Sequence, residues 1–245
     1  MKTENEKLYI VIPAYNERDN IYQVLDDWYP VVEKHSGGGE SRLVVIDDGS
    51  KDDTYAIMQE YAKTHPLFEP LTKPNGGHGA TVLYGYHYAL EHGADYIFQT
   101  DSDGQTDPAE FEKFWQIREG YDAIFGNRTS RGDGFSRAVV EKVLCAVLWT
   151  YFHVSVPDAN APFRLMKAGY VEEYLPLMPE NYNLPNALLT AFGAYFHRKI
   201  RFIPICFKPR QGGTNSINIR KIVRIGHQAL HDFCEIRKAA AKKRE

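Results

Sequence analysis

The stretch YIFQTDSDGQTDP (residues 96–108) decides the fold class, because an uncharged, mostly apolar segment runs directly into three aspartates and ends at a proline. Its apolar part is typical of a strand buried on both faces of a parallel sheet. Alternation along an extended backbone predicts that Asp101 and Asp103 point to the same side, about 6–7 Å apart at their Cα atoms. Such a carboxylate pair suits Mg²⁺ or Mn²⁺ and leaves coordination sites for water or diphosphate oxygens. We therefore predict metal ligands at Asp101, Asp103 and Gln105.

Two structural explanations compete for the same stretch. An EF-hand loop is excluded, because Thr106 stands where that loop requires glycine and because a strand precedes it. A polar turn that caps a helix near Pro108 explains Asp107 as an N-cap residue. It leaves Asp101 and Asp103 unexplained, so the metal hypothesis stands for these two residues.

Apolar runs alternate with helical patterns along the rest of the chain. The predicted strands are 8–13, 43–47, 96–101, 122–126 and 200–207, and the predicted helices are 19–35, 52–64, 78–92, 108–118, 137–153 and 184–196. This alternation predicts an α/β fold with a mostly parallel central sheet flanked by helices. Ligands of such sheets gather at the carboxyl ends of the strands. Polar clusters follow three of the strands, at PAYNE (13–17), DDGS (47–50) and DSDGQ (101–105).

Composition narrows the class of protein. The chain has 245 residues, 43% of them hydrophobic and 25% charged, which suits one large globular domain. A net charge of -3 gives no reason to expect a nucleic-acid partner. Cys145, Cys206 and Cys234 form no CxxC pair, which predicts reduced thiols in the core of a cytosolic protein. We find neither a cleavable leader nor an apolar run of membrane-spanning length, and therefore expect a cytoplasmic location.

The turn after the first strand excludes a dinucleotide-binding Rossmann fold, which requires G-x-G-x-x-G where this chain has PAYNE. Glycines occur instead in NGGHGA (75–80), just before a predicted helix. Their backbone N–H groups are suited to approach a phosphate. A tight turn with a helix N-cap is the alternative, and the sequence leaves both open.

Four motifs together carry a resemblance to a known family: IPAYNE (12–17), VVIDDGSKDDT (44–54), PNGGHGATVLYGYHYA (74–89) and DYIFQTDSDGQTDP (95–108). In this order and spacing they resemble the nucleotide-sugar-binding half of family 2 glycosyltransferases with the GT-A fold. With FGNR and PFRLMK further on, the pattern is most similar to the branch of dolichol-phosphate mannosyltransferase and bacterial polyprenyl-phosphate glycosyltransferases. The resemblance covers about residues 8 to 215. It implies inverting transfer from a nucleoside-diphosphate sugar, a UDP- or GDP-sugar, assisted by Mg²⁺ or Mn²⁺.

The resemblance also implies roles for individual residues. The donor-binding residues are Pro13, Ala14, Tyr15, Glu17, Asp48, Asp101, Ser102, Asp103, Arg128, Arg137 and Arg164. The catalytic residues are Asp103, Arg128 and Arg210. Asp48 would accept a hydrogen bond from the nucleotide base, whereas its neighbour Asp47 has the alternative role of shaping the turn. For Arg164, a salt bridge at the edge of the core is the alternative.

The sequence departs from the family pattern in places. His78 stands where the family often has lysine, and Ile217 and Asn218 stand where another lysine is expected. The C-terminal transmembrane helices of some members are not found. We expect a catalytic domain over 1–215 and an amphipathic helix with a charged tail over 216–245. Either this helix packs on the catalytic domain or its basic side lies on an anionic membrane.

The predicted acceptor follows from a missing residue. Family members that glycosylate a sugar hydroxyl commonly place a general base in an E-D pair, but this chain reads Glu180–Asn181. A phosphate acceptor is already anionic and needs positioning and charge balance, which Arg128, Arg137 and Arg210 would supply. We therefore expect hexose transfer to a dolichyl or undecaprenyl phosphate at the cytoplasmic membrane face. A saccharide hydroxyl acceptor with Glu180 as base remains the alternative, and a catalytically silent donor-binding subunit is a third.

Overall fold

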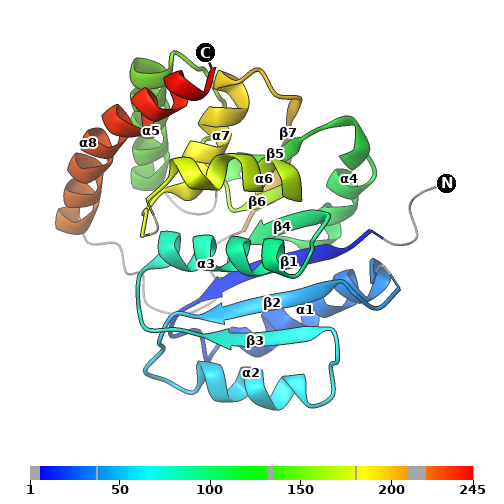
Figure 1. Cartoon of the computed structure of the whole chain (residues 1–245). Helices are drawn as coiled ribbons and strands as arrows, with labels where there is room; N and C mark the ends of the chain where they lie inside the picture. Colours follow the sequence, from blue (N-terminus) through cyan, green and yellow to red (C-terminus); the bar gives the residue numbers. More distant parts are fainter. Residues whose placement is uncertain (1–5, 37, 132–134, 180, 209–218, 245) are drawn as a thin grey trace.

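The computed structural model describes residues 6–36, 38–131, 135–179, 181–208 and 219–244, without the side chains of residues 130–139 and 219–231. Within these residues, seven strands form one sheet in the order β3-β2-β1-β4-β6-β5-β7 (Figure 1). The strands are β1 (Leu8–Ala14), β2 (Arg42–Asp47), β3 (Phe68–Thr72), β4 (Tyr96–Thr100), β5 (Ala123–Arg131), β6 (Phe163–Lys167) and β7 (Ile200–Phe207). β6 pairs antiparallel with β4 and β5, whereas the remaining pairs are parallel. The predicted mostly parallel sheet is confirmed.

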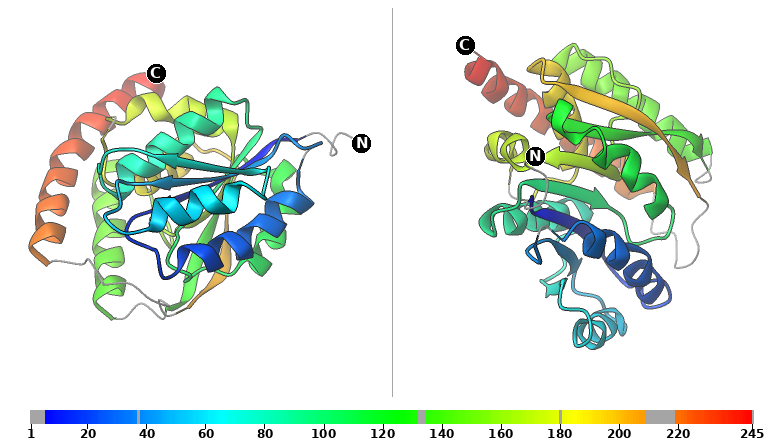
Figure 2. Two further views of the ribbon diagram at one scale, coloured as in Figure 1. Left: turned by 90° about the horizontal axis from the view of Figure 1, so that it is seen from below. Right: turned by 90° about the vertical axis from the view of Figure 1, so that its right-hand side faces the viewer.

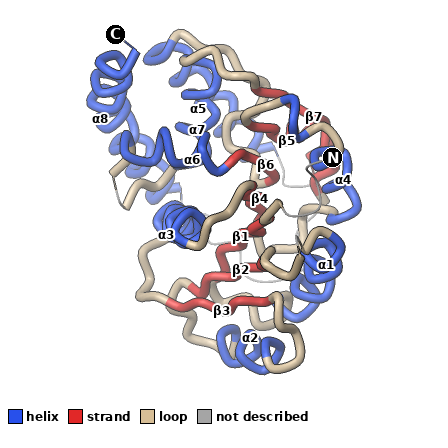
Figure 3. Tube along the Cα trace, turned by 45° about the vertical axis from the view of Figure 1, so that its right-hand side comes forward, coloured by secondary structure: helices blue, strands red, loops and turns tan. Residues whose placement is uncertain are grey.

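Helices cover both faces of the sheet (Figures 2 and 3). They are α1 (Ile21–Lys34), α2 (Thr54–Ala62), α3 (His78–Glu91), α4 (Phe111–Trp115), α5 (Phe135–Phe152), α6 (Ala168–Tyr174), α7 (Pro185–Tyr195) and α8 (Ile219–Arg244), with short 3-10 turns at η1 (Pro108–Glu110), η2 (Arg118–Gly120) and η3 (Leu175–Leu177). Alternate strand residues supply two cores: Leu43 and Val45 face α1, α2 and α4, whereas Val44 and Ile46 face α3 and α5 to α8. This is the three-layer arrangement of α/β domains.

Helix α3 packs closely on β1, and Gly85 makes this possible. A Cβ atom added at Gly85 would lie 2.3 Å from Cγ1 of Val11 and 2.9 Å from Cδ1 of Ile46. Real Cβ atoms do not approach other atoms so closely, so a larger residue would push the helix from the sheet. The close approach fixes the height of α3 above the sheet, and the glycine-rich segment (75–80) leads into the first turn of this helix.

The five predicted strands are confirmed, but β3, β6 and α6 were not predicted. β3 has only five residues and contains Pro70, which lowers its strand signal. An edge position tolerates that proline, and β3 is one of the two edge strands of the sheet. β6 is equally short, with Arg164 at its second position and Lys167 at its end, so it lacks the apolar run that marks a buried strand. In both cases tertiary position, rather than local pattern, determines the strand.

Helix α8 confirms the predicted C-terminal helix, and its second half packs on the rest of the protein. Phe233, Ile236 and Ala240 are buried in the same core as the sheet. The packing interpretation is thus confirmed for this half, whereas most of the predicted apolar stripe lies on side chains outside the described part of the chain. Across the described residues, no helix combines the length and apolar composition that a bilayer span needs.

The prediction of core cysteines is wrong for two of the three. Cys206 and Cys234 are exposed and Cys145 is half-buried. Cys206 lies on the edge strand β7, whose final residues alternate between exposed and buried positions. Cys234 follows the buried Phe233 on α8 and therefore points away from the core.

Candidate active site at the carboxyl ends of β1, β2 and β4

Three polar loops meet at one edge of the sheet. β1 pairs in parallel with β2 on one side and with β4 on the other, so the carboxyl ends of all three strands lie at the same edge. The segments 13–17, 47–50 and 101–105 begin at or directly follow these ends. This edge is where open α/β sheets bind ligands. The predicted convergence of the three clusters is therefore confirmed by the topology.

The loop after β1 is tied to the loop after β2. The backbone N–H of Asn16 donates to Oγ of Ser50 at 2.8 Å, and the backbone N–H of Lys51 donates to Oδ1 of Asn16 at 2.8 Å. Asn16 has a φ of 53°, a left-handed conformation that asparagine adopts more readily than most residues. The reciprocal bonds hold both loops in one rigid unit at the edge of the sheet.

The predicted nucleoside contacts differ in their accessibility. Tyr15 is 42% exposed at the edge of the sheet and is available to a ligand. Pro13 and Ala14 belong to β1 and are buried. Glu17 is also buried, and its Oε2 accepts a hydrogen bond from Nδ2 of Asn20 at 2.8 Å. Of these four predicted contacts, Tyr15 therefore presents the side chain best placed to meet a base or ribose.

Asp47 shapes the turn after β2, as the alternative interpretation expected. Its Oδ1 accepts from the backbone N–H of Ser50 at 3.1 Å, and its Oδ2 accepts from Oγ1 of Thr72 at 2.9 Å. The residue is only 2% exposed. Asp47 thus links the end of β2 to the end of β3 and faces away from solvent.

Asp48 binds the glycine-rich turn. Its carboxylate accepts from the backbone N–H groups of Gly76 and Gly77 at 2.8 and 2.9 Å and pairs with Nζ of Lys73. Burial opposes its charge, but hydrogen bonds from Lys73, Gly76, Thr81 and Gly77 outweigh burial and lower its pKa. The sequence suggested that these glycine N–H groups approach a phosphate. In the structure they bind the carboxylate of Asp48 instead. The tight-turn interpretation of the glycines is therefore the arrangement present.

The acidic turn departs from the expected geometry. β4 ends at Thr100, and residues 101–104 form a turn in which Gly104 has a φ of 69°. Asp101 and Asp103 are thus not successive same-side residues of an extended strand. Asp103 Oδ1 accepts from the backbone N–H of Gln105 at 3.2 Å, and both aspartates are half-buried. The turn still lies at the carboxyl edge of the sheet, with both carboxylates partly exposed.

His78 and Gln99 hold one oxygen of Asp101. Oδ1 of Asp101 lies 2.9 Å from Nε2 of His78 and accepts from Nε2 of Gln99 at 3.1 Å. Desolvation disfavours the imidazolium of His78, but the nearby carboxylates of Asp101, Asp103 and Asp48 outweigh it and raise its pKa. From the sequence, His78 is notable only as a departure from the family pattern. No sequence feature predicts that Gln99 contacts Asp101.

The far side of the acidic turn is attached to the end of β7. Nε2 of Gln105 donates to the carbonyl of Lys208, and the backbone N–H of Lys208 donates to the carbonyl of Gln105, both at 2.8 Å. Asp107 accepts from the N–H of Ala109 at 3.1 Å, which confirms its predicted capping role. Gln105 and Ser102 are 1% and 5% exposed. The predicted ligand Gln105 therefore braces the turn.

Arg128 is held by two carboxylates. Its Nε and one terminal nitrogen donate to both oxygens of Asp158 at 2.8 Å, and that same nitrogen donates to Glu141 at 3.0 Å. Burial, followed by the Asp158 carboxylate, raises the pKa of Glu141. Although burial opposes its charge, bonds from Arg128 lower the pKa of Asp158. The side chain of Arg128 is 9% exposed, so this predicted catalytic residue joins β5 to α5.

The remaining predicted arginines have different outcomes. Arg164 is fully buried, and its guanidinium donates to the carbonyls of Ala161 and Asn186 at 2.9–3.2 Å. It is thus a core residue in this structure, unlike the predicted donor contact, and it binds carbonyls rather than a salt-bridge partner. The side chain of Arg137 and all of Arg210 lie outside the described residues.

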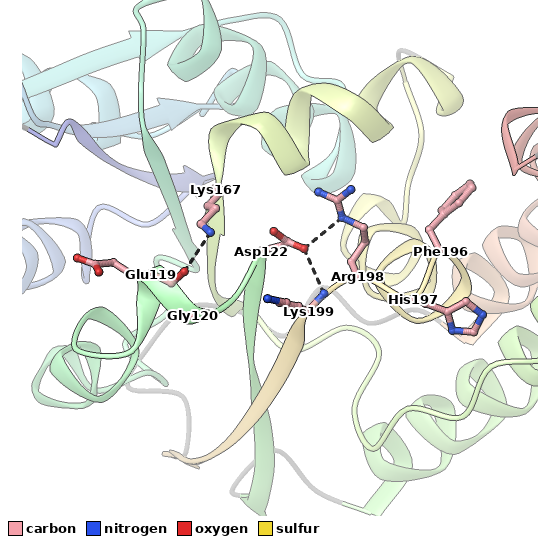
Figure 4. Close-up of a pocket in the computed structure, with 8 residues that line it drawn as sticks. All are labelled: Glu119, Gly120, Asp122, Lys167, Phe196, His197, Arg198 and Lys199. Atoms are coloured by element: carbon pink, nitrogen blue, oxygen red, sulfur yellow. Dashed lines mark hydrogen bonds and ion pairs between the residues drawn. The ribbon is translucent and has the colours of Figure 1, made fainter. Parts of the chain in front are cut away.

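A pocket at the opposite edge of the sheet contains none of the predicted residues (Figure 4). It is lined by Glu119, Gly120, Asp122, Lys167, Phe196, His197, Arg198 and Lys199. Asp122 and Lys199 precede the parallel strands β5 and β7, which places the pocket at their amino ends. Nε of Arg198 donates to Asp122 at 3.2 Å. The pocket's charges thus partly neutralise one another.

The acidic turn offers part of a metal-binding site. Within the described part of the chain, no three His, Cys, Asp or Glu side chains converge as a complete metal-binding group. Asp101 and Asp103 nevertheless offer carboxylate oxygens, the donors that Mg²⁺ and Mn²⁺ prefer. An incomplete protein ligand set is typical of ions that share their coordination with a substrate phosphate. The residues therefore fit a divalent ion bound together with a diphosphate.

The fold is that of GT-A glycosyltransferases. The structure is similar to glucosyl-3-phosphoglycerate synthase from Mycobacterium tuberculosis in complex with Mn²⁺, UDP-glucose and phosphoglyceric acid, with a TM-score of 0.67 over 95% of this chain and 80% of that one. The two sequences are 15% identical, so the likeness concerns the fold alone. It is the α/β nucleotide-sugar transferase fold expected from the sequence.

The chain belongs to glycosyl transferase family 2, whose family model matches residues 9–175, and it is therefore a glycosyltransferase. It is 24% identical over 228 residues to undecaprenyl-phosphate 4-deoxy-4-formamido-L-arabinose transferase of Proteus mirabilis, covering 91% of this chain and 67% of that protein. It is 26% identical over 176 residues to polyprenol monophosphomannose synthase of Mycolicibacterium smegmatis, covering 69% and 64%. The chain thus spans about two thirds of the length of these relatives.

Proposed function

We propose that this protein transfers a hexose from a UDP- or GDP-sugar to a polyprenyl phosphate, with inversion at the anomeric carbon and with help from Mg²⁺ or Mn²⁺. The observation that carries the proposal is the acidic turn, in which Asp101 and Asp103 lie at the carboxyl edge of the sheet. The nearby Tyr15 is exposed and suited to cover a nucleoside. A donor bound there would place its diphosphate beside the two carboxylates.

Asp101 and Asp103 would hold the ion. A divalent cation at this turn would offset the charge that develops on the leaving nucleoside diphosphate. The protein's own part is to keep the two carboxylates fixed. The bonds from His78 and Gln99 to Asp101, and from Gln105 to Asp103, support that role.

The proposed acceptor rests on the relatives and on the absence of an E-D pair in the sequence. Both relatives described above are named for polyprenyl substrates. A phosphate oxygen attacks without a general base, because it is anionic at neutral pH. We propose that Arg137 and Arg210, together with Arg128 once it leaves its carboxylate partners, balance the phosphate charge. We also propose that α8 brings the protein to the cytoplasmic membrane face.

The experiment is a screen of donors and acceptors with the purified chain. UDP- and GDP-hexoses are supplied with Mn²⁺ or Mg²⁺ and with undecaprenyl phosphate, dolichyl phosphate or an oligosaccharide, and the released nucleoside diphosphate and the labelled product are measured. We expect label in the lipid fraction, an inverted anomer by NMR and no turnover in EDTA. Label confined to the oligosaccharide, and lost in Glu180→Gln, would establish the hydroxyl acceptor instead. Donor binding without any turnover would identify a silent binding subunit.

A further inference from the structure

A chain of buried hydrogen bonds runs through the core to Asp101. The hydroxyl of Tyr86 on α3 donates to Oδ1 of Asn186 on α7 at 3.1 Å. Nδ2 of Asn186 donates to Oε1 of Gln99 on β4 at 2.9 Å, and Nε2 of Gln99 donates to Oδ1 of Asp101 at 3.1 Å. Tyr86, Asn186 and Gln99 are at most 2% exposed. We call these three residues the amide relay.

The direction of every bond in the amide relay is set by Asp101. An ionised carboxylate only accepts hydrogen bonds, so Gln99 must turn its NH₂ group toward Asp101. Its oxygen then faces Asn186, which must present its own NH₂ group. The oxygen of Asn186 consequently faces Tyr86, whose hydroxyl donates. Reversing either amide would bring two oxygens or two NH₂ groups together, so a single arrangement satisfies all four residues.

Arg164 fixes the middle of the relay. Its NH1 donates to the backbone carbonyl of Asn186 at 2.9 Å, and Oγ1 of Thr190 donates to the same carbonyl at 3.0 Å. Arg164 also lies opposite Gln99 in the pairing of β4 with β6. The backbone and the side chain of Asn186 are thus both constrained, and movement of this residue costs several buried bonds at once.

We propose that Gln99 and Asn186 are positioning residues that set the orientation of the Asp101 carboxylate from behind, with Tyr86 and Arg164 as their supports. This inference rests on the proposed function, in which Asp101 is a metal ligand. Hydrogen bonds to a ligating carboxylate fix its rotamer, and loss of such a partner typically costs about 10–100-fold in metal affinity. His78 contacts the same oxygen of Asp101 through a side chain that is 52% exposed, whereas the contact from Gln99 comes from a residue that is fully buried.

The test measures Mn²⁺ affinity apart from activity, from the EPR signal of free Mn²⁺ in the presence of UDP or GDP. We expect Gln99→Leu and Asn186→Leu to weaken Mn²⁺ binding by about 10–100-fold, and Tyr86→Phe to weaken it by a smaller factor. Tyr170→Phe is the matched control, because it removes another buried tyrosine hydroxyl that donates to α7, at Leu189, outside the relay. Urea unfolding of each variant reports stability, and Tyr86→Phe and Tyr170→Phe should lose similar amounts.

The outcomes separate this inference from the proposed function. If Asp101→Asn loses Mn²⁺ while the relay variants bind like the wild type, the relay has no positioning role. If Tyr170→Phe weakens Mn²⁺ binding as much as Tyr86→Phe, the effect follows stability and the inference is also overturned. If the wild-type protein binds no Mn²⁺ with either nucleotide, the metal role itself fails and the inference fails with it. If Asn186→Leu does not fold, the comparison of Mn²⁺ affinity between Tyr86→Phe and Tyr170→Phe still tests the inference.

Discussion

The two ends of the central sheet both carry charged side chains, but they hold them in different ways. At the carboxyl end, Asp48 and Asp101 receive directed hydrogen bonds from turns and from the buried core. At the amino end, Arg198, Asp122 and Lys167 line a pocket, where Arg198 bonds to Asp122 and Lys167 bonds to the backbone carbonyl of Glu119. A hollow lined by charged side chains is therefore weak evidence for a catalytic site. Oriented, anchored carboxylates are the stronger indication of a catalytic site.

The largest effect on glycosyl transfer is expected when the aspartates at the two ends of β4 are substituted in turn. Asp101 follows β4 and Asp95 precedes it, where its carboxylate accepts from the backbone N–H of Lys7 at 2.8 Å. Asp101→Asn should lower glycosyl transfer by about 10³-fold, because it removes charge that opposes the cation at the leaving group. Asp95→Asn keeps an acceptor oxygen and should change turnover little. Comparable loss in both variants, measured under saturating donor, would contradict the comparison.

A second contrast concerns two arginines of unequal burial. Arg128→Met leaves Glu141 and Asp158 without their cation and should cost about 3–5 kcal/mol of unfolding free energy. Arg198→Met removes a half-exposed pair with Asp122 at the other end and should cost about 0–1 kcal/mol. Urea denaturation gives both values. Should Arg128→Met remain fully stable yet inactive, Arg128 would act on substrate rather than on the fold.

Glycine substitutions test how the site is placed. Gly85→Ala should cost about 1–3 kcal/mol, because the added methyl collides with Val11 beneath α3. Gly169→Ala, in α6 near the opposite edge, meets no atom within 4 Å and should stabilise by up to about 1 kcal/mol. Thermal unfolding compares the two variants. A Gly85→Ala protein with wild-type stability would show that α3 is free to move from β1.

Acid should weaken the carboxyl end through Asp48. Its pKa is lower in the folded protein than in the unfolded chain, so its contribution is present above about pH 4 and disappears as the pH falls through the folded value. As the pH falls below about 5, the free energy of unfolding of Asp48→Asn should therefore decrease less than that of the wild type. Urea midpoints across this range give the slopes. Parallel profiles for the two proteins would rule out this contribution.

The smallest effect is expected in the pocket of Figure 4. Lys199→Ala removes a cationic side chain from its lining while leaving the backbone N–H that donates to Asp122 at 3.1 Å. We expect unchanged turnover and a stability within about 0.5 kcal/mol of the wild type. Donor affinity measured by calorimetry should also be unchanged. A marked loss of donor binding would move the candidate site to the amino end of the sheet.

Much of the carboxyl-edge geometry could be predicted, because parallel strands bring their ends together and apolar runs mark those strands. The hydrogen-bond and ion-pair partners of the charged side chains could not be predicted from the sequence. Arg128 and Arg164 belong to motifs that suggested ligand contacts. Both side chains are largely buried, and Arg128 binds Glu141 and Asp158 whereas Arg164 binds backbone carbonyls. The amide relay joins residues 87 positions apart, Gln99 and Asn186, and no local pattern signals such a pair.

The place of β6 has a consequence for the order of events during synthesis. β4 emerges from the ribosome and can pair with β1, but its other edge is completed only when Lys167 has been added. Translation proceeds at about 5–20 residues per second, so that edge waits for several seconds with unpaired N–H and C=O groups. The charged turn directly after β4 interrupts the apolar run at that edge. We expect nascent chains that end between β4 and β6 to be the species most dependent on chaperones.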